Sequence, residues 1–197
     1  MITTLIFDFA GVVSRKRFFP VVAENLSKKY GLPEEDIARS LKAHTMQYML
    51  GKESTRDFWK KVCGEFNIPY EEFVEVFSSS YDLNSEVIDL IRNLKPKYRI
   101  FLHSDNFNAL SQTLRKNPKL EGLFEKMYFS DEMHLIKEDE ASFRHVLRDI
   151  RKEAGECVFI DDQEINFVAA KHVGMQTILF KDANLLKEEL LRLGVQS

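Results

Sequence analysis

The sequence predicts an α/β fold, in which a Rossmann-like parallel sheet of five strands is flanked by helices and carries an inserted all-helical cap. Two patterns lead to this fold class. Five short apolar runs, rich in branched and aromatic residues, have the length of buried strands. Helical patterns separate the last four runs, whereas residues 14–84 contain helical patterns only. Strands that alternate with helices form parallel sheets with right-handed crossovers.

The core domain is expected in two parts of the chain, residues 1–13 and 85–197. Its strands are expected at residues 3–7, 99–103, 126–129, 157–160 and 176–180. Its helices are expected at residues 87–94, 106–114, 143–150, 165–174 and 185–193, where apolar side chains recur at helical spacing. Lys95-Pro96 ends the first of these helices, because the residue before a proline disfavours helical geometry.

The helical cap is expected to occupy residues 14–84. Its helices are predicted at residues 18–30, 33–41, 58–66 and 71–77. Gly31-Leu32-Pro33 ends the first helix, and the acidic residues 34–36 favour the start of the second. Ser54 or Thr55 can cap the third helix.

Composition excludes several classes of function. The chain has 197 residues, of which 44% are hydrophobic and 30% charged, enough to bury a core and remain soluble. Its formal net charge of −3 provides no basic field for nucleic acid or a membrane surface, and no apolar stretch approaches the ~20 residues of a membrane span. There is no signal-peptide pattern, and Cys63 and Cys157 lie far apart in apolar sequence. We therefore expect a cytoplasmic protein with reduced cysteines.

Carboxylates follow two of the predicted strands. Asp8 ends the first apolar run, with Gly11 at a place suited to a tight turn, and Asp161-Asp162 end the run at residues 157–160. The carboxyl ends of parallel strands meet at one edge of the sheet, where ligands bind. Three clustered carboxylates require a cation, and hard oxygen ligands favour Mg²⁺.

Two further residues complete a set suited to phosphoryl transfer. Ser104 follows the second strand beside the start of a helix, where its hydroxyl and the helix N–H groups can bind an anion. Lys137 lies in the segment between the third strand and the following helix, within reach of the same crevice. A metal and a lysine neutralise charge on the transferring oxygens while Asp8 attacks in line.

These motifs, in this order, resemble the haloacid dehalogenase-like hydrolase superfamily. The matching segments are DFAGVV at Asp8, LHSDN at Ser104, HLIKEDEASF at Lys137 and VFIDDQEIN at Asp161-Asp162. The resemblance covers nearly the whole chain, because the helical insertion sits where the first cap domain of that superfamily sits. The cap looks most like the branch of small sugar-phosphate phosphatases and the phosphatase domain of soluble epoxide hydrolase.

The resemblance implies roles at the metal. Asp8 would be the nucleophile that forms an aspartyl-phosphate, and it would also bind Mg²⁺. Ala10 would offer its backbone carbonyl to the metal. Asp162 would be a direct ligand, with Asp161 binding directly or through water.

The resemblance also implies roles at the phosphate. Ser104, with the amide of Asp105, would hold the phosphoryl oxygens, and Lys137 would steady both Asp8 and the phosphate. The side chains of Asp105 and Asn106 are expected to cap the following helix. Asn166 is expected to support the acidic loop.

Three positions depart from the family pattern. Many phosphatases of the superfamily have a second aspartate as general acid and base where this chain has Ala10, and losing that function typically costs ~10²–10⁴-fold in rate. A substrate with a good leaving group, such as an anomeric or acyl phosphate, needs less proton donation. Glu138 stands where proline is usual and His134 where glycine is common, so both are expected to reshape the loop of Lys137.

Three alternatives stay open. Dehalogenases of the superfamily act without metal, but the pair Asp161-Asp162 argues against that chemistry. Phosphonoacetaldehyde hydrolases also have alanine at the place of Ala10 and use a cap lysine, for which Lys42 or Lys52 would stand. A catalytically weak binding or regulatory homologue is the third alternative.

The expected function is therefore Mg²⁺-dependent hydrolysis of a small phosphorylated metabolite such as a sugar phosphate. Arg15, from a basic run that also suits an exposed linker, is a candidate to attract the substrate at the cap hinge. His44, Gln47 and Tyr48 are candidates to select it from the inner face of the cap. The sequence leaves monomer and homodimer open.

Overall fold

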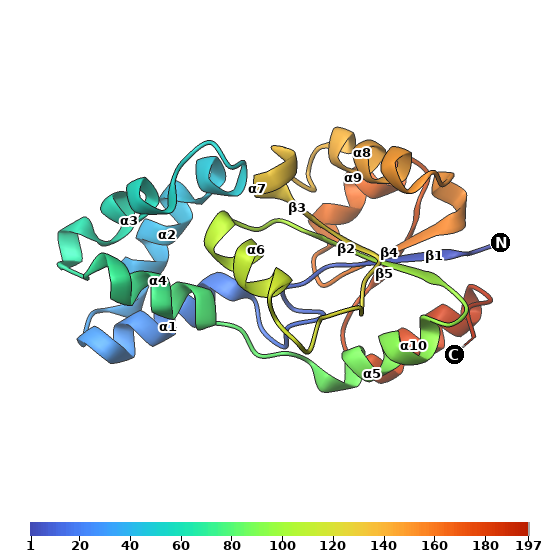
Figure 1. Cartoon of the computed structure of the whole chain (residues 1–197), viewed down its shortest axis with the longest axis horizontal. Coiled ribbons are helices and arrows are strands. Elements are labelled where there is room, and N and C mark those ends of the chain that lie inside the picture. Colours follow the sequence, from blue (N-terminus) through green and yellow to red (C-terminus); the bar gives the residue numbers. More distant parts are fainter. Residues whose placement is uncertain (197) are drawn as a thin grey trace.

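The computed structural model describes residues 1–196, with Glu65 described by its backbone alone. Five parallel strands form one sheet in the order β3-β2-β1-β4-β5 (Figure 1). The strands are β1 (Thr4–Phe7), β2 (Arg99–Ser104), β3 (Lys126–Phe129), β4 (Cys157–Asp161) and β5 (Gln176–Leu179). The predicted α/β fold class is confirmed, and each strand lies within a residue of its predicted limits.

Alternate residues of the central strands face opposite layers of helices, as the two-residue period of a strand requires. Leu5 and Phe7 belong to a core cluster that also contains residues of α5 (Ser85–Leu94) and α10 (Ala183–Arg192). Ile6 belongs to a second cluster, with residues of α8 (Glu140–Ile150) and α9 (Phe167–His172). The two pairs of helices lie on opposite sides of the sheet in Figure 1. Both faces of the central strand β1 are therefore buried.

The register of the sheet brings the ends of three strands to one level. Phe7 of β1 is paired with Leu102 of β2 and with Ile160 of β4. The next residue of β1 is Asp8, whose backbone N–H donates to the carbonyl of Ile160 at 2.8 Å. The polar residues at the ends of these three strands consequently share one edge of the sheet, the end of the strands that lies toward α6 (Asn108–Arg115) and α7 (Ser130–Met133) in Figure 1.

Residues 14–84, called the cap segment below, contain helices at the far end of the molecule from the chain termini (Figure 1). These are α1 (Phe18–Tyr30), α2 (Glu34–Met49), α3 (Thr55–Cys63), the 3₁₀ turn η1 (Gly64–Phe66) and α4 (Tyr70–Ser79). The ends of the segment are paired: Arg15 N–H donates to the carbonyl of Asp82 at 2.7 Å, and Asn84 N–H donates to that of Val13 at 2.8 Å. The chain thus leaves the core and returns to it at one place.

A cluster of aromatic rings joins the cap segment to the core. Phe107, directly before α6, has its ring centroid 4.4 Å from that of Phe77, 4.7 Å from Phe18 and 5.4 Å from Tyr48. These rings are almost fully buried, and aromatic contacts of this kind add to the free energy of apolar burial. Phe107 therefore fixes the position of α1, α2 and α4 above the end of β2.

Both cysteines are free and buried. Among the helices that the structure describes, none combines the length and the apolar character that crossing a bilayer demands.

Candidate active site

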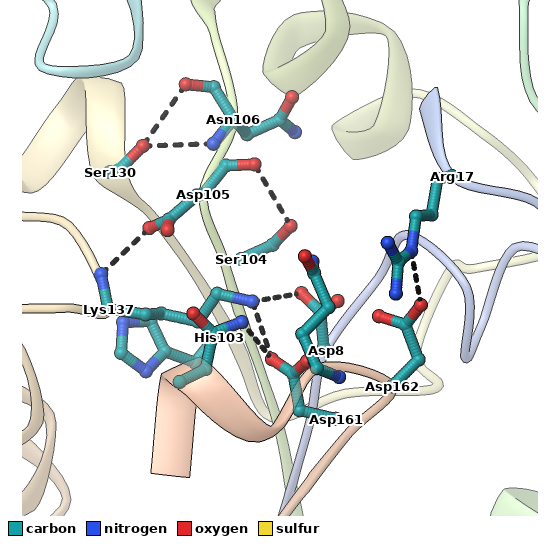
Figure 2. A network of polar contacts seen from close by, with 12 residues as sticks. Asp8, Arg17, His103, Ser104, Asp105, Asn106, Ser130, Lys137, Asp161 and Asp162 are labelled. Carbon is teal, nitrogen blue, oxygen red and sulfur yellow. Dashed lines mark hydrogen bonds and ion pairs between the residues drawn. The ribbon is translucent and has the colours of Figure 1, made fainter. Parts of the chain in front are cut away.

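Three carboxylates converge at the edge of the sheet (Figure 2). Asp8 follows β1, Asp161 is the last residue of β4 and Asp162 comes next in the chain. One oxygen from each lies within 4.8 Å of the others. Asp8 and Asp161 are almost completely shielded from solvent, so their negative charges need partners nearby.

Lys137 provides one of those partners. Its Nζ atom donates to Oδ1 of Asp8 at 2.8 Å and to Oδ2 of Asp161 at 2.7 Å (Figure 2). Its backbone N–H donates to Oδ1 of Asp105 at 3.0 Å, which holds the loop that carries the lysine. The structure thus brings Asp8, Asp161 and Lys137, which are distant in sequence, into direct contact.

Burial and charge act in opposite directions on the pKa values of this group. Burial raises the pKa of Asp8 to about 7, although the ammonium of Lys137 lowers it. Burial lowers the pKa of Lys137, but the charges of Asp8, Asp161 and Asp105 outweigh this effect and raise it above its ordinary value. Lys137 is therefore a permanent cation, and it compensates only part of the carboxylate charge.

The two neighbouring aspartates differ in their hydrogen bonding. Asp161 accepts hydrogen bonds from the backbone N–H of Gln163 at 2.8 Å and from Nδ2 of Asn166 at 2.9 Å, in addition to Lys137. Asp162 accepts from Nε of Arg17 at 2.8 Å through Oδ2. Its buried Oδ1 has no hydrogen-bond partner among the described residues. An orphaned, buried carboxylate oxygen next to two more carboxylates fits the donor set that a hard divalent cation prefers.

Gly11 shapes the space that Asp162 occupies. Its φ of +84° is a backbone conformation that favours glycine. A Cβ atom at this position would lie 2.6 Å from both Cγ and Oδ2 of Asp162. The turn after Asp8 therefore requires glycine for two reasons, and the second is direct contact with the acidic loop.

The segment after β2 corrects one expectation. Ser104 is buried, and its hydroxyl makes only a long contact of 3.5 Å with the carbonyl of Asp105, which leaves the oxygen available at the pocket. The expectation that Asp105 and Asn106 cap the next helix is wrong, since Phe107 precedes α6 without a side-chain cap. Instead, the Asp105 carboxylate accepts a hydrogen bond from the backbone N–H of Lys137, and Oδ1 of Asn106 accepts one from the N–H of Phe107.

A cavity of about 280 Å³ opens beside these groups. The predicted site residues that line it are Asp8, Ala10, Ser104, Asp105, Lys137 and Asn166. Glu138, one of the departures from the family pattern, also lines it. His134, another departure, has the φ of +58° that usually requires glycine, and its Nδ1 donates to the carbonyl of Leu50 at 2.8 Å. The loop before Lys137 is therefore bound to the end of α2.

The four residues expected to select the substrate do not line this cavity. Arg15 forms ion pairs with Asp82 and Glu86 at the base of the cap segment. Gln47 is exposed and lies in a separate surface pocket, and His44 is half-buried on α2. Tyr48 is fully buried, with its ring stacked on Phe58 at 4.4 Å and on Phe107 at 5.4 Å.

Different cap residues face the site. The cap segment contributes Arg17, Phe18, Phe19, Pro20 and Met49 to the cavity wall. The closeness of the first four to Asp8 in the chain was not a sufficient signal, because Arg15 is nearer still and does not line the cavity. Which cap residues face the site depends on how α1 and α2 pack against the core.

Known proteins resemble this chain in both sequence and structure. A family model described as haloacid dehalogenase-like hydrolase matches residues 2–174. A sesquiterpene phosphatase from Aspergillus oryzae is 26% identical over 193 residues, covering 95% of this chain and 94% of the relative. A drimenol cyclase from Aspergillus calidoustus is 25% identical over 166 residues, which is 84% of this chain but about a quarter (26%) of that protein. A HAD family enzyme from Bacteroides thetaiotaomicron, solved as a magnesium complex, is 27% identical with a TM-score of 0.78, covering 91% of this chain and 93% of the other.

Proposed function

The chain belongs to the haloacid dehalogenase-like hydrolase family, and on that premise we propose that it is a Mg²⁺-dependent phosphatase of a small phosphorylated metabolite. The observation that carries this proposal is the position of Lys137 between Asp8 and Asp161, with the unpaired Oδ1 of Asp162 beside them. Such a set combines a nucleophile, a fixed cation and free oxygen ligands in one buried place. Metal-assisted phosphoryl transfer through an aspartyl-phosphate uses all three.

We assign the metal ligands as Asp8, the backbone carbonyl of Ala10, and Asp162. Asp161 accepts three hydrogen bonds within the protein, which favours a positioning role for it or a contact through water, whereas Oδ1 of Asp162 is unpaired. When bound, Mg²⁺ would act as a Lewis acid on the phosphoryl oxygens. The magnesium complex of the Bacteroides enzyme supports the choice of metal.

The chain's own residues account for the remaining steps. A carboxylate oxygen of Asp8 attacks phosphorus, an O–P bond forms, and the bond from phosphorus to the leaving oxygen breaks. Lys137 favours the ionised form of Asp8 and holds it in place, while the Ser104 hydroxyl and the Asp105 N–H bind the other phosphoryl oxygens. Water then releases phosphate from the aspartyl-phosphate. Ala10 cannot donate a proton to the leaving group, so the leaving oxygen must be stabilised in another way or be weakly basic.

These residues define the reaction more narrowly than the class of substrate. Sugar phosphates are the example that the sequence suggested, and the relative described as a sesquiterpene phosphatase supports a phosphorylated small molecule of another kind. The orphaned Asp162 oxygen favours a metal-dependent phosphatase over a metal-free dehalogenase. Lys42 and Lys52, the lysines considered for phosphonatase chemistry, do not line the cavity of Asp8.

Phosphate release with and without Mg²⁺ tests the proposal. Acetyl phosphate is a suitable first substrate, because its leaving group needs no proton. The Asp8→Asn variant should lose release by at least ~10³-fold, whereas Asp131→Asn should retain it. Asp131 is a matched control, since it is also a buried aspartate but is paired with Ser111 at 2.7 Å, outside this cavity. Equal activity of wild type and Asp8→Asn, or no Mg²⁺-dependent release by the wild type, would contradict the proposal; the second result would favour a binding protein.

A further inference from the structure

The lining of the cavity beside Asp8 is of two chemical kinds. The polar lining comes mainly from the core and includes Asp8, Ser104, Asn106, Lys137, Glu138 and Gln163. The apolar lining includes Phe18, Phe19, Pro20, Met49, Phe107 and Leu110. A phosphate group bound by Asp8, Ser104 and Lys137 therefore has hydrocarbon side chains of the cap segment within the same cavity.

The cap side of the cavity is mostly apolar among the described lining residues. Of the five residues that the cap segment contributes, four are apolar, and the fifth is Arg17. Nε of Arg17 is already bound to Asp162 at 2.8 Å. A sugar hydroxyl placed against the four apolar side chains would lose its hydrogen bonds to water without gaining a partner, which disfavours binding there.

The apolar wall is also fixed in place. The ring of Phe107 packs 4.7 Å from Phe18 and 5.6 Å from Phe19, and Phe77 supports it from behind at 4.4 Å. On the core side, Ile165 continues the lining and is 59% exposed, although it is a large apolar residue. A rigid apolar wall gains affinity for a hydrocarbon at little cost in side-chain ordering.

We propose that the substrate is a phosphomonoester of an apolar, hydrocarbon-like alcohol, and that Phe18, Phe19 and Met49 of the cap segment recognise that hydrocarbon. This inference rests on the proposed phosphatase function. It replaces a sugar with a hydrocarbon as the leaving group, and it assigns specificity to these residues in place of His44, Gln47 and Tyr48.

Two series of probes test the inference. The first is the kcat/KM of phosphate release, with Mg²⁺, from ethyl, butyl and hexyl phosphate and from glucose 6-phosphate. All four are esters of primary alcohols, so leaving-group basicity hardly differs among them. We expect kcat/KM to rise by about two- to fourfold per methylene, as burial of hydrocarbon predicts, and hexyl phosphate to exceed glucose 6-phosphate by at least tenfold. The second is the Kd of ethyl-, butyl- and hexylphosphonate measured by calorimetry, which should fall along the series.

Variants on α2 locate the recognition. Met49→Gln should flatten both chain-length series, and Met49→Leu should keep them. Met46→Gln is the matched control, because Met46 lies on the same helix, is 46% exposed and does not line the cavity. Flat series for the wild type, or a preference for glucose 6-phosphate, would overturn the inference while leaving the phosphatase proposal intact. Release of phosphate from acetyl phosphate but from none of the esters would mean that the strongly basic alkoxides cannot leave without a general acid at the position of Ala10, and the phosphonate affinities would then decide the apolar site. Release from neither would overturn the phosphatase proposal, and the phosphonate affinities would again decide the apolar site on their own.

Discussion

The ammonium of Lys137 lies 2.8 Å from a carboxylate oxygen of Asp8, and both side chains are almost completely buried. The same ammonium lies 2.7 Å from Asp161, so one cation serves two buried anions. Removing one partner of a buried ion pair leaves an uncompensated charge, which typically costs ~3–5 kcal/mol. Lys137→Met should therefore lower the free energy of unfolding by about that amount, and Mg²⁺ should restore part of it.

Urea unfolding with and without Mg²⁺ measures this effect. Lys126→Met is the matched control, because Lys126 forms an ion pair with Asp149 at the same 2.7 Å but both side chains are about half exposed. Exposed pairs of this kind contribute at most ~1 kcal/mol. Equal losses for the two variants would mean that burial does not strengthen the dependence on Lys137.

Gly11 lets the acidic loop approach the end of β1. In Gly11→Ala the new Cβ would meet the carboxylate of Asp162 at 2.6 Å, so the carboxylate must move. We expect a weaker apparent affinity for Mg²⁺ in a titration of phosphate release. Gly31→Ala separates this contact from backbone strain, since Gly31 also has a positive φ, of +67°, but a Cβ added there would meet no atom within 4 Å. Equal Mg²⁺ affinities for the two variants would contradict the assignment of Asp162 as a ligand.

Arg17 competes with a cation for Asp162. Its Nε atom occupies Oδ2, and its charge repels a divalent ion. Because the Arg17 side chain is 55% exposed, the pair is worth at most ~1 kcal/mol, so Arg17→Gln should raise the apparent Mg²⁺ affinity by up to about fivefold. Arg15→Gln, two residues away and paired with Asp82 and Glu86, should leave it unchanged. A lower affinity in Arg17→Gln would show instead that Arg17 holds Asp162 in its binding position.

Ala10 makes the reaction sensitive to the leaving group. Without a general acid at this position, kcat/KM should fall steeply across a series of aryl phosphates as the pKa of the phenol rises. General acids typically contribute ~10²–10⁴-fold, so Ala10→Asp, whose side chain would enter the same cavity, should raise turnover of the poorest leaving groups and flatten the series. A series that is already flat in the wild type would show that another residue donates the proton.

The sequence predicted those parts of the site that depend on local pattern. Asp8, Ser104 and Asp161 end apolar runs, and once the strands are parallel and adjacent the sheet must bring their ends together. Lys137 could be predicted because the segment HLIKEDEASF resembles the lysine motif of the superfamily. The limits of the strands were equally well determined, because each run changes abruptly from apolar to polar.

The parts that the sequence did not predict depend on contacts between distant segments. Tyr48 and Met49 are neighbours on α2, and one is buried among aromatic rings while the other faces the cavity. The packing of α2 on Phe107 decides which of the two faces the site. A rotation of α2 by one residue would bury Met49 and turn Tyr48 toward the cavity. The bond from His134 to Leu50 across the same junction is likewise invisible in a single sequence.

His103 should make the folded state sensitive to acid. It is fully buried beside Ser142, at 2.7 Å, and burial, together with the charge of Lys137, lowers its pKa to about 3. In the unfolded chain a histidine has a pKa of about 6.5. Below pH 6.5 the unfolded state therefore binds a proton that the folded state binds only near pH 3. The free energy of unfolding consequently falls as the pH is lowered through this interval.

The expected loss from His103 between pH 7 and pH 5 is about 2 kcal/mol in the free energy of unfolding. The pKa values of Asp8, Asp105 and Asp131, which burial raises, act in the opposite direction, so the comparison must be made between variants. His103→Gln should be less stable at pH 7 but should lose about 2 kcal/mol less than the wild type on going to pH 5, as measured by urea unfolding at both pH values. His172→Gln is the control, because the His172 side chain is 65% exposed. If wild type and His103→Gln lose the same stability between these pH values, His103 is protonated in the folded protein and its burial does not control the acid response.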